Sequence, residues 1–229
     1  MLKFLPILLI AAYAVVMWKM SASALRRKLD RESRPLDQPE LEAVSRRLGR
    51  AAEVPELRAF VLPEPAFNGL AAPDGRIFIT DGVLQAFRRG EVSADEIGSI
   101  IAHELGHVAM GHSKRRMVEM AAQNSARMVL MMVIGRFIPF IGPWIANILV
   151  NLVTAGLSRR DEYEADAYAA ALMRRAGVAP KAQWTLFEKL ADKHGDIPAG
   201  AAWLMGHPPM PKRIAAVRRL QAQWDATGQ

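Results

Sequence analysis

His103-Glu104-Leu105-Gly106-His107 is the stretch around which the rest of this sequence is organised. It has the form H-E-x-x-H, and the residues on both sides are apolar and compatible with a helix. On a helix, residues four apart lie on one face about one turn from each other, so both imidazoles can reach a single ion. Glu104 lies about 100° further round, where its carboxylate can hold a water bound to that ion. Two imidazoles and a carboxylate placed as a base predict a zinc hydrolase.

A zinc ion held by two histidines needs a third protein ligand and one position open to water. The segment 158–175 is a predicted helix that offers four carboxylates, Asp161, Glu162, Glu164 and Asp166. Glu162 and Asp166 are four residues apart and share a face, whereas Glu164 lies on the other side. We expect Glu162 to bind the metal and Asp166 to accept the remaining N–H of a zinc-bound imidazole. The alternative is a solvated acidic face paired with neighbouring arginines.

Composition restricts the other possibilities. The chain has 229 residues, of which 51% are hydrophobic, and a formal net charge of +7. This length allows one domain, or a smaller domain with membrane segments. Because the basic runs flank apolar segments and no nucleic-acid module is visible, we expect membrane lipid rather than nucleic acid as a partner. The sequence contains no cysteine, which excludes disulfides and thiolate ligands.

Residues 1–28 predict an N-terminal membrane anchor or a signal segment. An apolar run from Phe4 to Trp18 is bordered by Lys3 and Lys19. A cleaved signal peptide is the alternative, with Ala22-Ser23-Ala24 as the cleavage site, but Lys19 between the run and this site weakens that interpretation. More cations follow the run than precede it, so the catalytic domain is expected on the cytoplasmic side; a periplasmic or secreted location is the alternative.

Residues 36–229 predict one domain that is mainly α with a small β-sheet (α+β). Strands are expected over 58–62, 68–72 and 76–80, with a tight turn between the last two. Ser93 and Glu96 form a capping box that begins the helix of the zinc motif, which ends near Gly111. Other helices are expected over 37–52, 81–87, 158–175, 179–192 and 212–225. Residues 128–157 predict an apolar helical hairpin, either buried against the domain or dipped into the bilayer.

Two further residues have simpler interpretations. His112 is nine residues after His103, which places it on the far side of an ideal helix as a helix-end residue. Arg213 is expected to steady a carboxylate or the loop of His207, or only to cover the last helix.

Three motifs in order resemble the HtpX-type gluzincin metallopeptidases, a family that includes the CAAX prenyl endopeptidases and the Oma-type proteases. The motifs are His103–His107, Ser158–Asp166, and His207-Pro208-Pro209 with Arg213. The resemblance implies a zincin-like metallopeptidase domain and a membrane-linked, zinc-dependent endopeptidase, often acting in protein quality control. The four transmembrane segments of HtpX itself are not evident in this sequence.

The same resemblance assigns roles to individual residues. It places the third zinc ligand on Glu162 and the carboxylate that supports a ligand histidine on Asp166. An extended substrate is expected to bind as an added strand along Asn68-Gly69-Leu70-Ala71, where Gly69-Leu70 replaces the Ala-Phe of the family. His207 resembles a histidine near the metal that either stabilises the oxyanion or plugs the open position.

We therefore predict a zinc endopeptidase that binds one Zn²⁺ per chain, with Glu104 as general base and a protein or peptide as substrate. A non-catalytic, membrane-associated binding or assembly factor is the alternative; in it, zinc would only tie helices 93–112 and 158–175 together, with His207 as a permanent fourth ligand. A third hypothesis, that the chain binds nucleic acid, rests on its net charge alone. The sequence does not indicate the physiological substrate or the oligomeric state.

Overall fold

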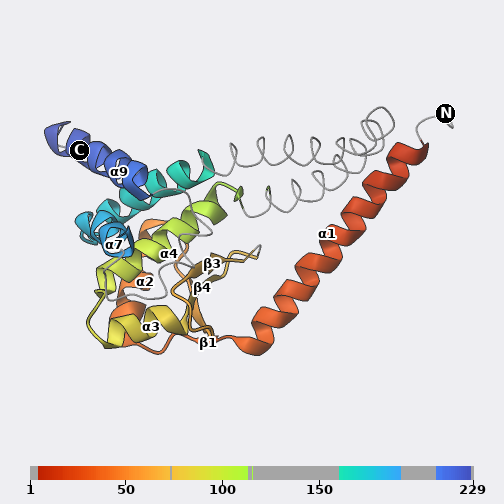
Figure 1. Cartoon of the computed structure of the whole chain (residues 1–229), viewed down its shortest axis with the longest axis horizontal. Helices are drawn as coiled ribbons and strands as arrows, with labels where there is room; N and C mark the ends of the chain where they lie inside the picture. Colours follow the sequence, from red (N-terminus) through yellow and green to blue (C-terminus); the bar gives the residue numbers. More distant parts are fainter. Residues whose placement is uncertain (1–4, 73, 113–114, 116–159, 192–209, 228–229) are drawn as a thin grey trace, which may run out of the picture.

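The computed structural model describes residues 5–72, 74–112, 115, 160–191 and 210–227 (Figure 1). The hairpin predicted over 128–157 and His207 lie outside these residues. The described part is mainly helical and contains a small sheet, as the sequence predicts.

The sheet has four strands in the order β1-β2-β4-β3. The strands are β1 (Arg34–Pro35), β2 (Ala59–Leu62), β3 (Gly69–Ala71) and β4 (Ile77–Thr80). β2 and β4 are parallel, and the β3–β4 and β1–β2 pairs are antiparallel. All four residues of β4 are buried, which explains why the apolar residues Ile77, Phe78 and Ile79 follow one another without alternation. The strand–turn–strand predicted before the zinc motif is confirmed, whereas β1 was not predicted.

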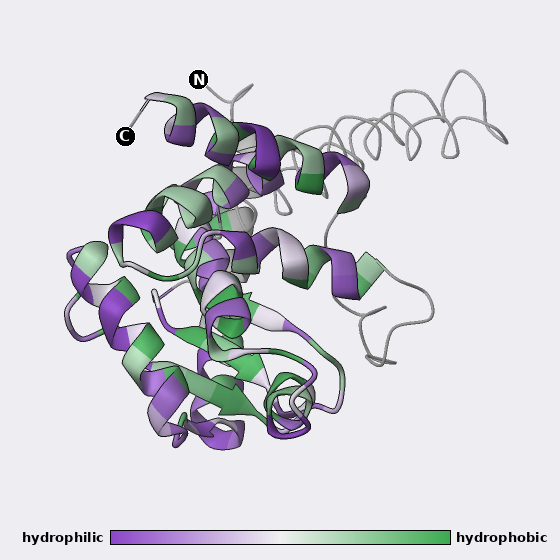
Figure 2. Cartoon of the chain, turned by 90° about the vertical axis from the view of Figure 1, so that its left-hand side faces the viewer, coloured by the Kyte–Doolittle hydropathy of each residue, from purple (hydrophilic) through white to green (hydrophobic). Residues whose placement is uncertain are grey.

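Helices pack against the sheet and against one another. They include α2 (Pro39–Ala51), α3 (Asp81–Arg88), α4 (Ala94–Ala109), a helix whose described part is 160–175, α7 (Lys181–Ala191) and α9 (Met210–Thr227). Each overlaps its predicted range. Hydrophobic residues concentrate in the strands and on the helix faces that are turned toward them (Figure 2). The core therefore lies between the sheet and the helices, with α4 running through it (Figure 1).

α4 carries the H-E-x-x-H stretch and is buried along most of its length. The predicted capping box is present: Glu96 N donates to Ser93 Oγ at 3.2 Å, and Ser93 N donates to Glu96 Oε2 at 2.8 Å. Every residue from 96 to 107 is buried, since α4 packs against α2, α7, β3 and β4. Gly106 favours close helix packing, because a Cβ there would lie only 3.2 Å from the backbone of Ala165.

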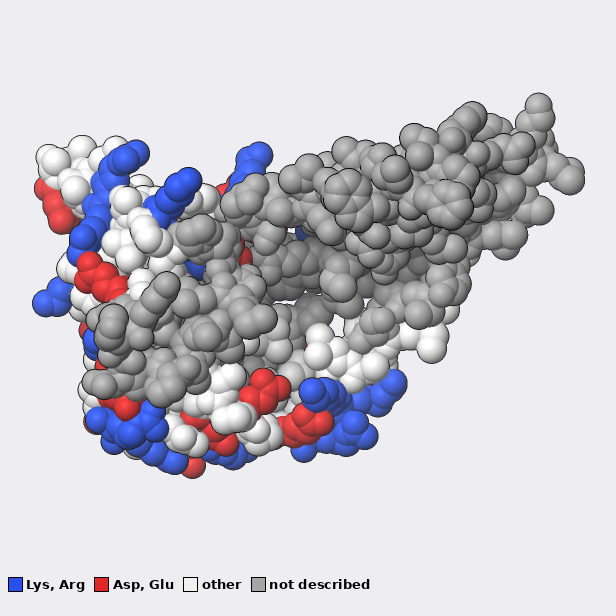
Figure 3. Space-filling view, in the orientation of Figure 1, with Lys and Arg blue, Asp and Glu red and all other residues white. Residues whose placement is uncertain are grey.

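α1 (Leu5–Glu32) is one continuous helix that leaves the body of the molecule (Figure 1). Its C-terminal end docks on the sheet, where Leu29 is buried with Phe78. Two ion pairs add to this contact, Arg76–Asp30 at 2.7 Å and Arg26–Asp74 at 3.6 Å. Figure 3 shows the Lys, Arg and acidic side chains that gather around this end of the helix, at the lower right.

Across the described ranges, no helix combines the length and the apolar character needed to cross a membrane. The anchor expected within residues 1–28 stays a prediction.

Candidate metal centre

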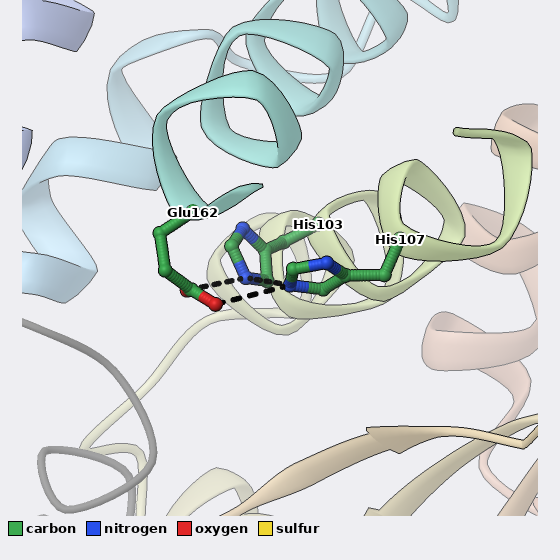
Figure 4. Close-up of side chains that lie close together, drawn as sticks. All are labelled: His103, His107 and Glu162. Carbon is green, nitrogen blue, oxygen red and sulfur yellow. Dashed lines mark hydrogen bonds and ion pairs between the residues drawn. The ribbon is translucent and has the colours of Figure 1, made fainter. Parts of the chain in front are cut away.

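Three buried side chains from two helices converge at one point (Figure 4). His103 Nε2 and His107 Nε2 are 3.1 Å apart. Glu162 Oε2 lies 3.4 Å from His103 Nε2, and Glu162 Oε1 lies 3.4 Å from His107 Nε2. Ligand atoms placed about 2.1 Å from one ion at tetrahedral positions are about 3.4 Å from each other. The donor set and its spacing therefore fit a zinc ion.

The two helices come together because of small residues at their contact. His103 and His107 stand one turn apart on α4, with their rings edge to face and the ring centres 4.7 Å apart. Glu162 comes from the beginning of the described part of the helix 160–175. The contact of Gly106 with Ala165 brings this helix close enough for one carboxylate to reach both imidazoles.

His103 is supported by a carboxylate. Its Nδ1 lies 2.9 Å from Asp166 Oδ1. Asp166 also accepts two hydrogen bonds from Arg213, both at 2.6 Å. Arg213 is only 1% exposed, and its guanidinium lies 4.7 Å from the centre of the Phe187 ring. Of the alternatives for Arg213, the structure thus shows contact with a carboxylate.

Burial and neighbouring charged groups control the ionisation of His103 and Asp166 when no metal ion is present. Burial lowers the pKa of His103, but hydrogen bonds with Asp166 and Glu162 outweigh burial and raise this pKa to about 9. Burial raises the pKa of Asp166, but Arg213 and His103 bring it below the ordinary value. The carboxylate of Asp166 therefore stays ionised, as a partner of a ligand histidine must be.

His107 is supported by another histidine. Its Nδ1 lies 2.9 Å from His112 Nδ1, and His112 Nε2 lies 3.3 Å from Glu164 Oε2 and 3.9 Å from Asp161 Oδ1. His112 is fully buried. Burial lowers its pKa, and the carboxylates of Asp161 and Glu164 oppose this only in part.

The prediction that His112 lies on the far side of the helix was wrong. α4 ends at Ala109, and Gly111 has a φ of +70°, a left-handed conformation that takes the backbone off the path of an ideal helix and leaves His112 in contact with His107. The sequence signal was a glycine directly before a histidine at the end of the motif helix.

The remaining predicted site residues lie around this centre. Glu104 is buried beside the ligands on α4. Asn68 precedes β3, and its Oδ1 accepts a hydrogen bond from Gly69 N at 2.9 Å. β3 is the last strand of the sheet and packs beside α4, with Gly69 and Ala71 buried and Leu70 exposed. His207 belongs to the part of the chain that is not described.

This fold and site have the arrangement of a class of protein, the zincin-like metallopeptidase: a helix bearing two histidines and a glutamate, a second helix that brings a carboxylate to the histidines, and a small sheet alongside. The profile of peptidase family M48 matches residues 35–221, which is most of the chain. The chain belongs to this family. Zinc is the cofactor of the family, and the side chains of His103, His107 and Glu162 could hold it.

Three relatives show how far the similarity extends. Metalloprotease LoiP of Escherichia coli is 34% identical over 54% of this chain. Protease HtpX of Pseudomonas putida is 28% identical over 78%, and mitochondrial metalloendopeptidase OMA1 of Arabidopsis thaliana is 29% identical over 86%. The matches span 47% of LoiP, 69% of HtpX and 37% of OMA1, so the chain covers less than half of two of these relatives.

Proposed function

We propose that the chain is a zinc-dependent endopeptidase in which His103, His107 and Glu162 hold the metal and Glu104 is the general base. The observation that carries this proposal is the convergence of three buried ligand atoms, all within 4.8 Å of one another, beside a buried glutamate that follows the first histidine. A purely structural zinc site does not need that glutamate.

Zinc bound at this site would polarise a peptide carbonyl and lower the pKa of a water toward about 7. Glu104 takes a proton from the attacking water as the new C–O bond forms. It then returns this proton to the leaving amine as the C–N bond breaks, so the carboxylate is regenerated. Asp166 holds His103 in the orientation that presents Nε2 to the metal site. His207 as an oxyanion donor or as a plug stays a prediction.

The substrate is proposed to be an extended protein or peptide segment that adds to the sheet at β3. Two observations support this position. β3 is the terminal strand, so no strand pairs with its outer edge among the described residues. β3 also packs beside α4, which carries both histidines. Residues Asn68–Ala71 would then supply backbone hydrogen bonds to the substrate, with exposed Leu70 facing its side chains.

Membrane association and a role in protein quality control are also proposed, with residues 1–28 as the anchor, 36–229 as the peptidase domain, and the domain on the cytoplasmic side. α1 supports this, since it exposes Val15, Val16 and Met20 on the part that extends away from the sheet. The full chain should then remain with membranes after carbonate extraction. A C-terminal tag should be cleaved by added protease only after spheroplasts are lysed; cleavage in intact spheroplasts would place the domain on the other side.

Glu104→Gln tests the chemistry. The amide keeps the shape but accepts no proton, so cleavage of an unfolded substrate should fall by about 10²–10⁴-fold while zinc remains bound. Glu40→Gln, on the exposed surface of α2, is the matched control and should cleave normally. Unchanged cleavage by Glu104→Gln would remove this residue from the mechanism. A wild-type chain that binds zinc but cleaves nothing would favour the binding or assembly factor.

A further inference from the structure

The side of His107 that faces away from the metal site carries an unusual contact. His107 presents Nε2 to His103 and Glu162, and its other nitrogen, Nδ1, lies 2.9 Å from His112 Nδ1. The ring centres are 5.1 Å apart, with the planes at 63°. Both side chains are buried, so the two ring nitrogens interact with each other away from bulk water.

Only one arrangement of protons fits this contact when a metal is bound. A ligand histidine is neutral and uses the lone pair of Nε2, so its Nδ1 carries the hydrogen and can only donate. His112 Nδ1 must then accept, which leaves the hydrogen of a neutral His112 on Nε2. This nitrogen faces Glu164 Oε2 at 3.3 Å and Asp161 Oδ1 at 3.9 Å, both of which are acceptors.

We propose that His112 is a positioning residue for His107: as a neutral acceptor it fixes the tautomer and the ring orientation of this ligand. The inference deepens the proposed function and rests on the metal site. The role is the one that a carboxylate plays for His103, performed here by an imidazole whose own N–H is directed to two acidic side chains.

The same residues connect the two helices that bear the ligands. His112 follows the end of α4, and Glu164 and Asp161 come from the helix that carries Glu162. His112, Asp161 and Glu164 have the residue types of a cation site. Asp161 is paired with Arg115, however, and Glu164 with Arg160 at 2.8 Å. These guanidinium groups supply the positive charge that a metal ion would supply, so the geometry favours a hydrogen-bonded support over a second metal.

The test compares two substitutions in the full chain. His112→Phe keeps a ring of similar size but has no acceptor, whereas the carbonyl oxygen of His112→Asn can stand near the position of Nδ1 and accept from His107. The zinc association constant, measured by competition with a chelator, should fall by about 10- to 100-fold in His112→Phe and recover most of this loss in His112→Asn. The visible spectrum of the cobalt-substituted chain should change in His112→Phe and return toward wild type in His112→Asn.

Ser45→Ala is the control. It removes a buried hydroxyl of α2 that donates to Leu41 O at 2.8 Å, and it should leave zinc affinity unchanged. Unchanged affinity in His112→Phe, or equal losses in the Phe and Asn variants, would overturn the role of His112 as acceptor. Two zinc ions per wild-type chain would overturn it in favour of a second metal site. If His112→Phe does not fold, a more than tenfold loss in folded His112→Asn would overturn it, and wild-type affinity would support it. A wild-type chain that binds no zinc would instead refute the proposed function itself.

Discussion

The two imidazoles of the proposed metal centre stand one turn apart on α4, but the residues that support them differ. His103 contacts Asp166, which accepts two hydrogen bonds from Arg213. The side chains of Asp166 and Arg213 are at most 2% exposed. His107 contacts His112, which has Glu164 as an acidic partner. The Glu164 side chain is 35% exposed and forms an ion pair with Arg160, whose side chain is 79% exposed.

The difference has a physical consequence. Charges buried together interact strongly, and removing one leaves the other without compensation. Charges near water are screened and contribute little on their own. We infer that His103 is held rigidly by an ion pair whose loss is costly, whereas His107 is held by hydrogen bonds that tolerate adjustment at their outer end.

The largest effect is expected for Asp166→Asn. The neutral amide leaves Arg213 buried with its main counter-charge removed, so the free energy of unfolding should fall by about 3–5 kcal/mol. Zinc affinity should fall by about 10- to 100-fold because His103 loses its anionic partner. Chemical denaturation and chelator competition measure the two effects. Asp225→Asn removes the same charge from an exposed pair with Arg174 and should cost less than about 1 kcal/mol. Equal losses in the two variants would abolish the contrast between buried and exposed pairs.

A second prediction concerns pH. In the metal-free protein the pKa of His103 is about 9, against an ordinary value of 6.5, so zinc must displace a proton at neutral pH. The zinc association constant should therefore fall by about tenfold for each pH unit below 9. Because folding raises the pKa of His103, protonation of this residue stabilises the metal-free protein. This stabilisation is complete below pH 6.5 and is lost as pH rises through 9. Calorimetry in buffers of different ionisation enthalpy counts the released protons, and no release at pH 7 would contradict the protonated state of His103.

Arg213→Lys should have a moderate effect. Lysine keeps the positive charge but cannot make two parallel hydrogen bonds to Asp166. We expect a loss of about 2 kcal/mol in the free energy of unfolding, and zinc binding weakened less than by Asp166→Asn. Arg218→Lys, in an exposed pair with Glu188, is the control and should change stability little. Wild-type stability of Arg213→Lys would show that charge alone, without the paired hydrogen bonds, is sufficient.

The smallest effect is expected for Glu164→Gln, at the outer end of the support for His107. The carboxylate is partly exposed, so stability should change by about 1 kcal/mol or less. Zinc affinity should change much less than in Asp166→Asn, since Asp161 still faces His112. A loss as large as that of Asp166→Asn would make the two supports equivalent and contradict the contrast.

Local patterns were sufficient to predict most of the elements. The capping box of Ser93 and Glu96 begins α4 as expected, because both partners lie within one turn. The strands before the zinc motif were predicted from apolar runs and a turn, and they pair as a hairpin. β1 was not predicted, since two residues that include Pro35 carry no strand pattern and pair only because β2 is adjacent.

Local patterns also predicted part of the candidate site. Spacing on one helix places His103 and His107 on the same face, and spacing on another places Glu162 and Asp166 together. Neither spacing reveals how the two helices approach each other. Sequence reasoning also missed His112, because an ideal helix was extended past its real end at Ala109.

By itself, the sequence determined which atoms could bind a metal: two imidazoles one turn apart and a carboxylate on a later acidic helix. Only the tertiary structure decided which groups support those ligands. The close packing of Gly106 on Ala165 sets the distance between the helices, the left-handed Gly111 leaves His112 in contact with His107, and α9 brings Arg213 to Asp166. Ligand spacing follows from the period of one helix, which neighbouring residues control, whereas these supports depend on contacts between segments far apart in the chain, which local patterns do not encode.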